Sequence, residues 1–124
     1  MDDGDLHEKR YIVLHVGADE TRACVINSSV SHFIQSRPKL LQCQVAMSAA
    51  AHGFMDHDSY VDGSRTWIYD TESVVEELMN HTDWILGMAT ADLCDRLITA
   101  FRRSPNLSVA DVEFLTESLR PIAS

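Results

Sequence analysis

Two short apolar runs lie near the start of the chain, separated by a polar stretch. Residues 11–16 (YIVLHV) and residues 22–27 (RACVIN) are mostly apolar, and several of them are β-branched. Runs of this length and composition are typical of buried strands. Residues 17–20 (GADE) between them suit a turn, so the pattern predicts an antiparallel hairpin. The turn lacks an Asn-Gly or Asp-Gly pair, which leaves its type open.

The middle of the chain alternates short polar connectors with short apolar runs. Ser28-Ser29 is placed to cap a short helix, because apolar residues recur at helical spacing behind it. Arg37-Pro38 would then end or restart that helix. Gly63-Ser64 predicts a bend or a bulge between two strands. Three further strands are expected, at the end of residues 41–47 (QVAM), over 59–62 and over 66–69.

From residue 70 onward the hydrophobic period becomes helical. Asp70-Thr71 starts one helix, and Thr90 caps a second after the apolar link 84–87. Ser108 opens a third helix with a capping box. We expect the apolar faces of the three helices to turn inward (Val74, Val75 and Leu78; Leu93, Leu97, Ile98 and Phe101; Val112, Leu115 and Leu119). Strands come first and helices last, which predicts an α+β fold: a small bent antiparallel sheet or partial SH3-like barrel, with an inserted short helix and C-terminal helices.

Length and composition narrow the class of protein. The 124 residues suit one domain, expected over residues 10–124 behind a flexible lead-in at residues 1–9. Hydrophobic residues make up 45% of the chain, and no apolar run is long enough to span a bilayer. The first ten residues, MDDGDLHEKR, do not resemble a secretory signal. The three cysteines form no C-x-x-C pair, which argues against a disulfide framework and favours a reducing, cytoplasmic location.

The charge of the chain bears on its partners. A formal net charge of −9 weighs against RNA, since phosphate binding requires Lys and Arg, although a local basic groove stays open. The basic clusters are small, namely Arg37 with Lys39 and Arg102 with Arg103. We expect no cofactor and no membrane partner.

The densest polar stretch is residues 52–65, HGFMDHDSYVDGSR. If residues 59–62 form a strand, Asp58, Tyr60 and Asp62 share one face, and Ser59 and Val61 share the other. The first set presents two carboxylates and a phenol together. The alternative is an Asx turn, formed by Asp58 and its neighbours, that starts the strand.

Several residues around this face are candidates for chemistry. His57 beside a carboxylate could act in general acid–base catalysis, and Arg65 is the local cation for a phosphate or for an exposed ion pair. The histidine spacing fits no metal motif, so no metal site is expected. Candidate substrate contacts are Asn27, Ser28, Tyr60 and Ser64, although Asn27 and Ser28 could equally belong to a helix cap. His15, inside an apolar strand, is expected to be partly buried, with a catalytic role as the alternative.

Three stretches of the second half follow one another in a characteristic order: WIYDTESVVEEL, ILGMAT and ADLCDRLITAFRRSPNLS. A late strand, an Asp-led short helix, an apolar-Gly-apolar-small step and a long C-terminal helix in this order resemble the small-barrel MazF/PemK (Kid, CcdB-like) toxins. The first half, from YIVLHV to HGFMDHDSYVD, resembles small bacterial proteins described as PemK-like. The resemblance covers residues 10–107.

The resemblance implies a toxin–antitoxin protein that forms a homodimer, binds an antitoxin and cleaves RNA without a metal. In that case His57 or Asp58 would act as the base, Arg65 would steady the scissile phosphate and Asp62 would orient its neighbours. The chain departs from the family pattern, because no Gly-Asp precedes the first strand and the Arg37-Pro38 pair follows the expected helix. The family's catalytic arginine has no matching position. A catalytically inactive acidic interaction module of the same fold, and a small-ligand pocket at residues 52–65, remain as alternatives.

Overall fold

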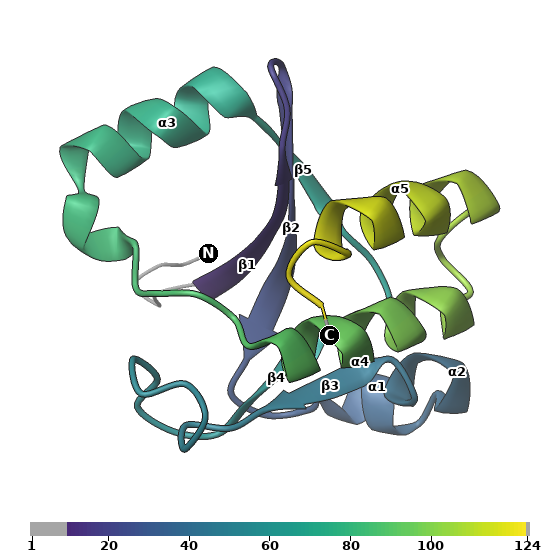
Figure 1. Cartoon of the computed structure of the whole chain (residues 1–124). Helices are drawn as coiled ribbons and strands as arrows, with labels where there is room; N and C mark the ends of the chain where they lie inside the picture. The colour runs from purple at the N-terminus through teal and green to yellow at the C-terminus, as the bar shows by residue number, and fades with distance from the viewer. Residues whose placement is uncertain (1–9, 124) are drawn as a thin grey trace.

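The structure is a computed structural model that describes residues 10–123. The expected lead-in over residues 1–9 lies outside the described residues. Strands β1 (Arg10–Val16) and β2 (Glu20–Asn27) form the expected antiparallel hairpin, the tall pair of strands in Figure 1. The register shifts between Val13 and His15, so Leu14 forms a bulge in β1.

Strand β2 is the centre of the sheet. Its first edge pairs with β1, and its second edge is shared by β5 (Trp67–Asp70) and β4 (Ser59–Asp62), while β3 (Gln44–Met47) pairs with the outer edge of β4. All these pairings are antiparallel. Within residues 10–123 the five strands form an open sheet that does not close on itself. The expected α+β fold with a small antiparallel sheet is therefore confirmed.

A wide bulge separates β4 from β5. The chain advances six residues from Val61 to Trp67, whereas the facing strand advances three from Ile26 to Ala23. Residues 63–66 leave the ladder, so the bend expected at Gly63-Ser64 is confirmed. A Cβ built on Gly63 would lie 2.8 Å from the Ala100 Cβ and 2.9 Å from the Cys43 carbonyl oxygen, so only glycine fits where the bulge meets the helix layer.

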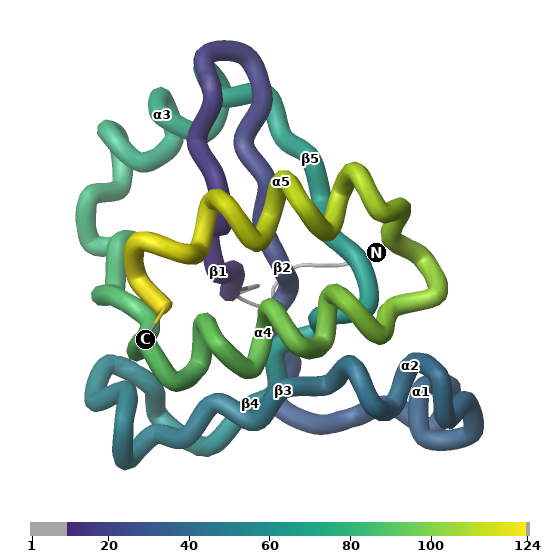
Figure 2. Tube along the Cα trace, turned by 45° about the vertical axis from the view of Figure 1, so that its right-hand side comes forward, coloured from purple at the N-terminus to yellow at the C-terminus, as the bar shows by residue number. Residues whose placement is uncertain are grey.

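Helices α4 (Ala91–Arg103) and α5 (Val109–Leu119) cover one face of the sheet and form the core with it (Figure 2). The Thr90 hydroxyl caps α4 by accepting the Leu93 N–H, and Ser108 with Asp111 forms the capping box of α5. The side chains expected to face inward are buried or half-buried, and those of α4 are among the most buried in the molecule (Leu93, Leu97, Ile98, Phe101, Val112, Leu115, Leu119). Each fully buried Leu or Phe stabilises the fold by about 1.5–3 kcal/mol.

The short helices α1 (His32–Gln35) and α2 (Pro38–Leu41) follow β2. The expectation that Ser28-Ser29 caps the first of them is wrong, because the N-cap is Ser31, whose hydroxyl accepts the Ile34 N–H. Strand β2 stays paired with β4 as far as Asn27. The chain therefore uses the next residues to leave the sheet before a helix can begin.

Helix α3 (Thr71–Asn80) lies on the other side of the sheet from α5, as Figures 1 and 2 both show. Asp70 caps it by accepting the Ser73 N–H, and the short 3₁₀ helix η2 (Thr82–Trp84) follows. Of the residues expected to turn inward, Val74 and Leu78 are half-buried, but Val75 is exposed. None of the helices within residues 10–123 has the length and apolar character that crossing a membrane requires.

Candidate functional site

The alternation expected along β4 is present. Ser59 and Val61 are buried, Tyr60 is exposed and Asp62 is half-buried. Asp58 precedes the strand and Asp62 ends it, and four residues of extended chain span about 13 Å. The two carboxylates are thus placed at opposite ends of the strand rather than side by side.

Asp58 and His57 are engaged locally. The Asp58 Oδ1 accepts the Ala49 N–H at 2.9 Å, which ties the end of the loop 48–58 to its beginning. Asp58 does not form the alternative Asx turn, because the N–H that it accepts belongs to a residue nine positions earlier in the chain. His57 is exposed, and its Nδ1 lies 3.0 Å from the Asp58 carbonyl oxygen and 3.3 Å from the Ser59 Oγ.

Asp62 holds the bulge together. Its Oδ1 accepts hydrogen bonds from the Ser64 N–H at 3.0 Å, the Ser64 hydroxyl at 2.6 Å and the Gln44 side-chain amide at 2.9 Å. The bond to the N–H two residues on is an Asx turn. Ser64 is buried, and its carbonyl oxygen accepts the Ser104 hydroxyl at the end of α4. Asp62 and Ser64 therefore join β3, the bulge and the helix layer.

The remaining candidates are dispersed. The Arg65 guanidinium lies 4.5 Å from the centre of the Trp67 ring, and Asn27 pairs with Tyr60 in the ladder while Ser28 is in the exposed turn beyond it. Within residues 10–123, no ion pair links His57, Asp58, Asp62 or Arg65 with any of the others. Over the same residues, no group of three or more His, Cys, Asp and Glu is arranged to hold a metal ion.

His52, the first residue of the polar stretch, points inward. It is 2% exposed, its Nδ1 donates to the Ser48 carbonyl oxygen at 3.1 Å, and its Nε2 accepts the Thr90 N–H at 3.1 Å. Both ring nitrogens of His52 are thus hydrogen-bonded within the fold.

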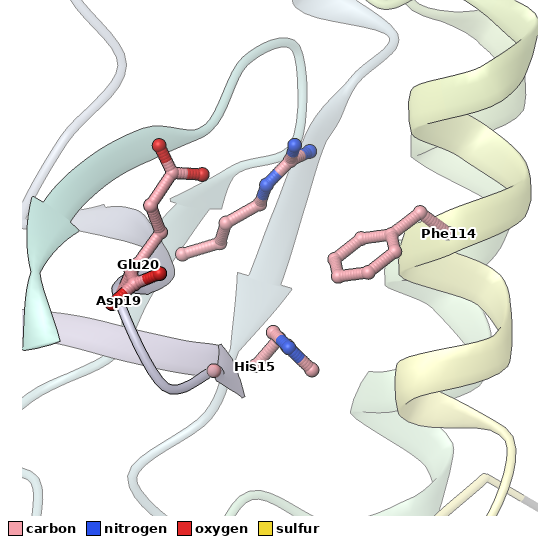
Figure 3. A pocket seen from close by; sticks show the side chains of 6 residues that line it. His15, Asp19, Glu20 and Phe114 are labelled. Atoms are coloured by element: carbon pink, nitrogen blue, oxygen red, sulfur yellow. The ribbon is translucent and has the colours of Figure 1, made fainter.

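An open hollow that the sequence did not reveal lies between the β1–β2 hairpin and α5 (Figure 3). His15 and Arg22 are paired in the ladder and both contact Phe114, with ring centroids 4.7 Å apart for His15 and the guanidinium carbon 4.8 Å from the centroid for Arg22. Asp19 and Glu20 lie on the opposite side from Phe114 in Figure 3. In the sequence, only a histidine within an apolar strand pointed to this hollow, because Phe114 lies far along the chain. The bulge at Leu14 turns His15 toward α5, which simple alternation along the strand would not do.

A second surface is apolar and consists of residues 71–88, called here the α3 segment. Large apolar side chains are exposed along it (Val75 44%, Met79 75%, Trp84 53%, Ile85 64%, Leu86 43%, Met88 74%). Monomeric proteins rarely expose contiguous apolar patches of this kind without a use for them. Singly exposed apolar residues are common, whereas here six large ones are exposed within eighteen residues.

The sheet face beside the α3 segment extends this surface. Tyr11, Val13 and Trp67 are exposed on it, and the Tyr11 and Tyr69 rings meet edge to face at 5.7 Å. Burial, together with the hydrogen bond and charge of Tyr11, raises the pKa of Tyr69 to about 12, so its phenol stays protonated. Exposed apolar side chains thus lie both on this face and along the α3 segment.

Comparisons of the chain with protein-family models, with curated proteins and with solved structures found no match. The class of protein is therefore defined by the fold and the surfaces alone. It is an α+β domain with an open antiparallel sheet, two helices packed on one face, and an apolar, largely uncovered segment on the other.

Proposed function

We propose that this domain is an interaction module that binds a partner protein through the α3 segment and the sheet face beside it. The observation that carries the proposal is the exposure of six large apolar side chains within residues 71–88. Covering one such side chain completely is worth about 1.5–3 kcal/mol, so even partial coverage of several would give useful affinity.

The surroundings of the candidate catalytic residues support a binding role over a catalytic one. Asp62 uses its Oδ1 for three hydrogen bonds from Ser64 and Gln44, and Asp58 anchors the loop 48–58. A general base needs to be within reach of the proton it takes, with a partner that orients it. Carboxylates that are hydrogen-bonded in this way support a structural role for Asp58 and Asp62.

The test uses the full chain with a photo-crosslinking amino acid at Ile85, in the cells that make the protein. The matched control carries the same residue at Val109 on α5, which is 77% exposed. A discrete crosslinked protein is expected from position 85 and not from position 109. Crosslinks that are absent from both positions, or equal at both, would overturn the proposal.

A second candidate is the toxin-type, metal-independent endoribonuclease that the family resemblance implies, with its homodimer and antitoxin partner. The hollow beside α5 favours it, because a histidine, an arginine and an aromatic ring stand together there. His15 would take the proton of the attacking hydroxyl and Arg22 would face the phosphate, although Arg22 is already paired with Asp111 at 3.2 Å. The acidic charge of the chain weighs against this candidate.

This candidate is tested by RNA cleavage in vitro and by growth after induction. Cleavage that His15→Ala abolishes would locate the activity in the hollow, and cleavage that His57→Ala abolishes would locate it at β4. Wild-type protein that neither cleaves RNA nor slows growth excludes the toxin function.

A further inference from the structure

We infer that the α3 segment is a docking surface for a basic amphipathic helix of a partner protein. The inference rests on the proposed function and adds the chemistry of the partner. Apolar side chains of the docked helix would cover Met79, Ile85 and Met88, and its Lys or Arg side chains would face the acidic residues around them.

The formal charges of the α3 segment have one sign. Residues 71–88 include four acidic residues and neither Lys nor Arg (Glu72, Glu76, Glu77 and Asp83). Within residues 10–123, no ion pair engages these four carboxylates. Two more acidic residues lie next to the N-terminus of α3, where Asp70 pairs with Glu20 in the β5–β2 ladder. A basic partner would neutralise this field and be steered toward it during association.

The same charges argue against other occupants. A second copy of the chain would bring an identical acidic rim and a net charge of −9 against this one. Surfaces that bind anionic membranes carry Lys and Arg around their apolar residues, whereas this one carries Glu and Asp. A basic protein segment therefore fits best.

The apolar side chains suit the reception of a helix. Val75 and Met79 are four residues apart and lie one above the other on the exposed side of α3. Methionine is unbranched and adaptable, which is why it is common at surfaces that receive amphipathic helices. Trp84 supplies an aromatic anchor of the kind that dominates interface energies.

Two contacts orient the C-terminal part of the α3 segment. The Trp84 ring stacks on His81, with the centroids 4.0 Å apart. Gly87 lies so close to Phe54 that a Cβ there would come within 2.6 Å of the ring, which ties the segment to the loop 48–58. Because the positions are set in advance, binding would lose less conformational freedom.

The experiment titrates synthetic peptides of about 18 residues, long enough to form a helix, into the full chain. The first probe has Leu on one face and Lys on the other, the second has Glu in place of Lys, and the third is a scrambled form of the first. Calorimetry is expected to show the first binding about tenfold or more tightly than either of the others. Ile85→Ser or Met79→Ser should weaken it by about tenfold, whereas Val109→Ser should not.

A second pair of variants tests the charge. Glu76→Gln with Glu77→Gln should weaken binding of the basic peptide and reduce its salt dependence, while Glu113→Gln with Glu117→Gln on α5 should leave both unchanged. Equal binding of the acidic or scrambled peptide would overturn the inference. So would binding to anionic vesicles in place of the peptide, or self-association in sedimentation that Ile85→Ser removes.

The two proposals fail separately. If crosslinking at position 85 yields a partner but the basic peptide does not bind, the inferred chemistry is wrong and the interaction module stands. If neither crosslink nor peptide binding occurs, both are wrong.

Discussion

The imidazole of His52 caps helix α4 from a distant part of the chain, since its Nε2 accepts the backbone N–H of Thr90 at 3.1 Å. The first N–H groups of a helix have no partner within it, so an acceptor at this position satisfies a half-buried donor. The Nδ1 of the same ring donates to Ser48, which places the proton on Nδ1. His52 thereby joins the start of the loop 48–58 to the start of the main core helix.

Replacing His52 should be costly. His52→Ala leaves a cavity and the unpaired Thr90 N–H, and we expect it to lower the free energy of unfolding by about 2–4 kcal/mol in urea denaturation. His57→Ala is the matched control, because that ring is exposed and its hydrogen bonds are to Asp58 and Ser59, one and two residues along the chain. It should cost less than about 0.5 kcal/mol. Equal costs for the two variants would contradict the capping role.

Gly63 should not accept even a methyl group. The added Cβ of Gly63→Ala would overlap Ala100 and the Cys43 carbonyl, so the bulge or α4 must shift, and we expect a loss of about 1–3 kcal/mol. Gly53→Ala is the control, since nothing lies within 4 Å of the Cβ it would add. Urea midpoints of the two variants provide the measurement. A neutral Gly63→Ala would show that the bulge is not pressed against α4.

Asp62 is expected to matter through its shape rather than its charge. Asp62→Ala removes the acceptor of three hydrogen bonds and should cost about 1–3 kcal/mol. Asp62→Asn keeps an oxygen at the same position and should retain most of the stability. If both variants were equally stable but any RNA cleavage disappeared in both, Asp62 would belong to an active site after all.

Asp111 should make the domain more sensitive to acid. The Ser108 N–H and hydroxyl, with a smaller effect of Arg22, lower the pKa of Asp111 below its usual value. A carboxyl with a lowered folded-state pKa adds stability that is present above its unfolded pKa of about 3.9 and is lost as the pH falls through the folded value. Unfolding measured from about pH 2.5 to 7 should therefore show a shallower acid loss for Asp111→Asn than for wild type. A parallel loss would refute the coupling.

The three cysteines should be unreactive in the folded protein. Cys24, Cys43 and Cys94 are buried, and burial raises the pKa of each thiol, with the Asp62 charge adding to the effect on Cys24 and Cys43. The thiolate is the reactive form, so a thiol reagent should modify none of them until denaturant is added. Rapid modification of one cysteine in the native state would show that the side chains packed around it open locally.

The sequence determined the local elements. It predicted the hairpin strands, β3, the bounds of β4 and the caps of α3, α4 and α5. These features depend on the hydrophobic period, the capping residues and the turn residues, which act within a few positions of one another. The α1 cap was not, since Ser28, Ser29 and Ser31 are chemically equivalent and the pairing of Asn27 with Tyr60 decides where the helix begins.

Only the tertiary structure decided which side chains meet. The sequence showed that polar residues crowd into 52–65, whereas the fold decided that His52 turns inward, that Asp58 and Asp62 have separate hydrogen-bond partners and that His57 is exposed. The bulge at Leu14 brings His15 to Phe114 across the chain. Val75 belongs to the helical pattern of α3, yet it is 44% exposed because no other element within residues 10–123 covers it. The hydrophobic period of the sequence indicates which residues share a face of a helix or strand. The packing of distant segments decides whether that face is covered.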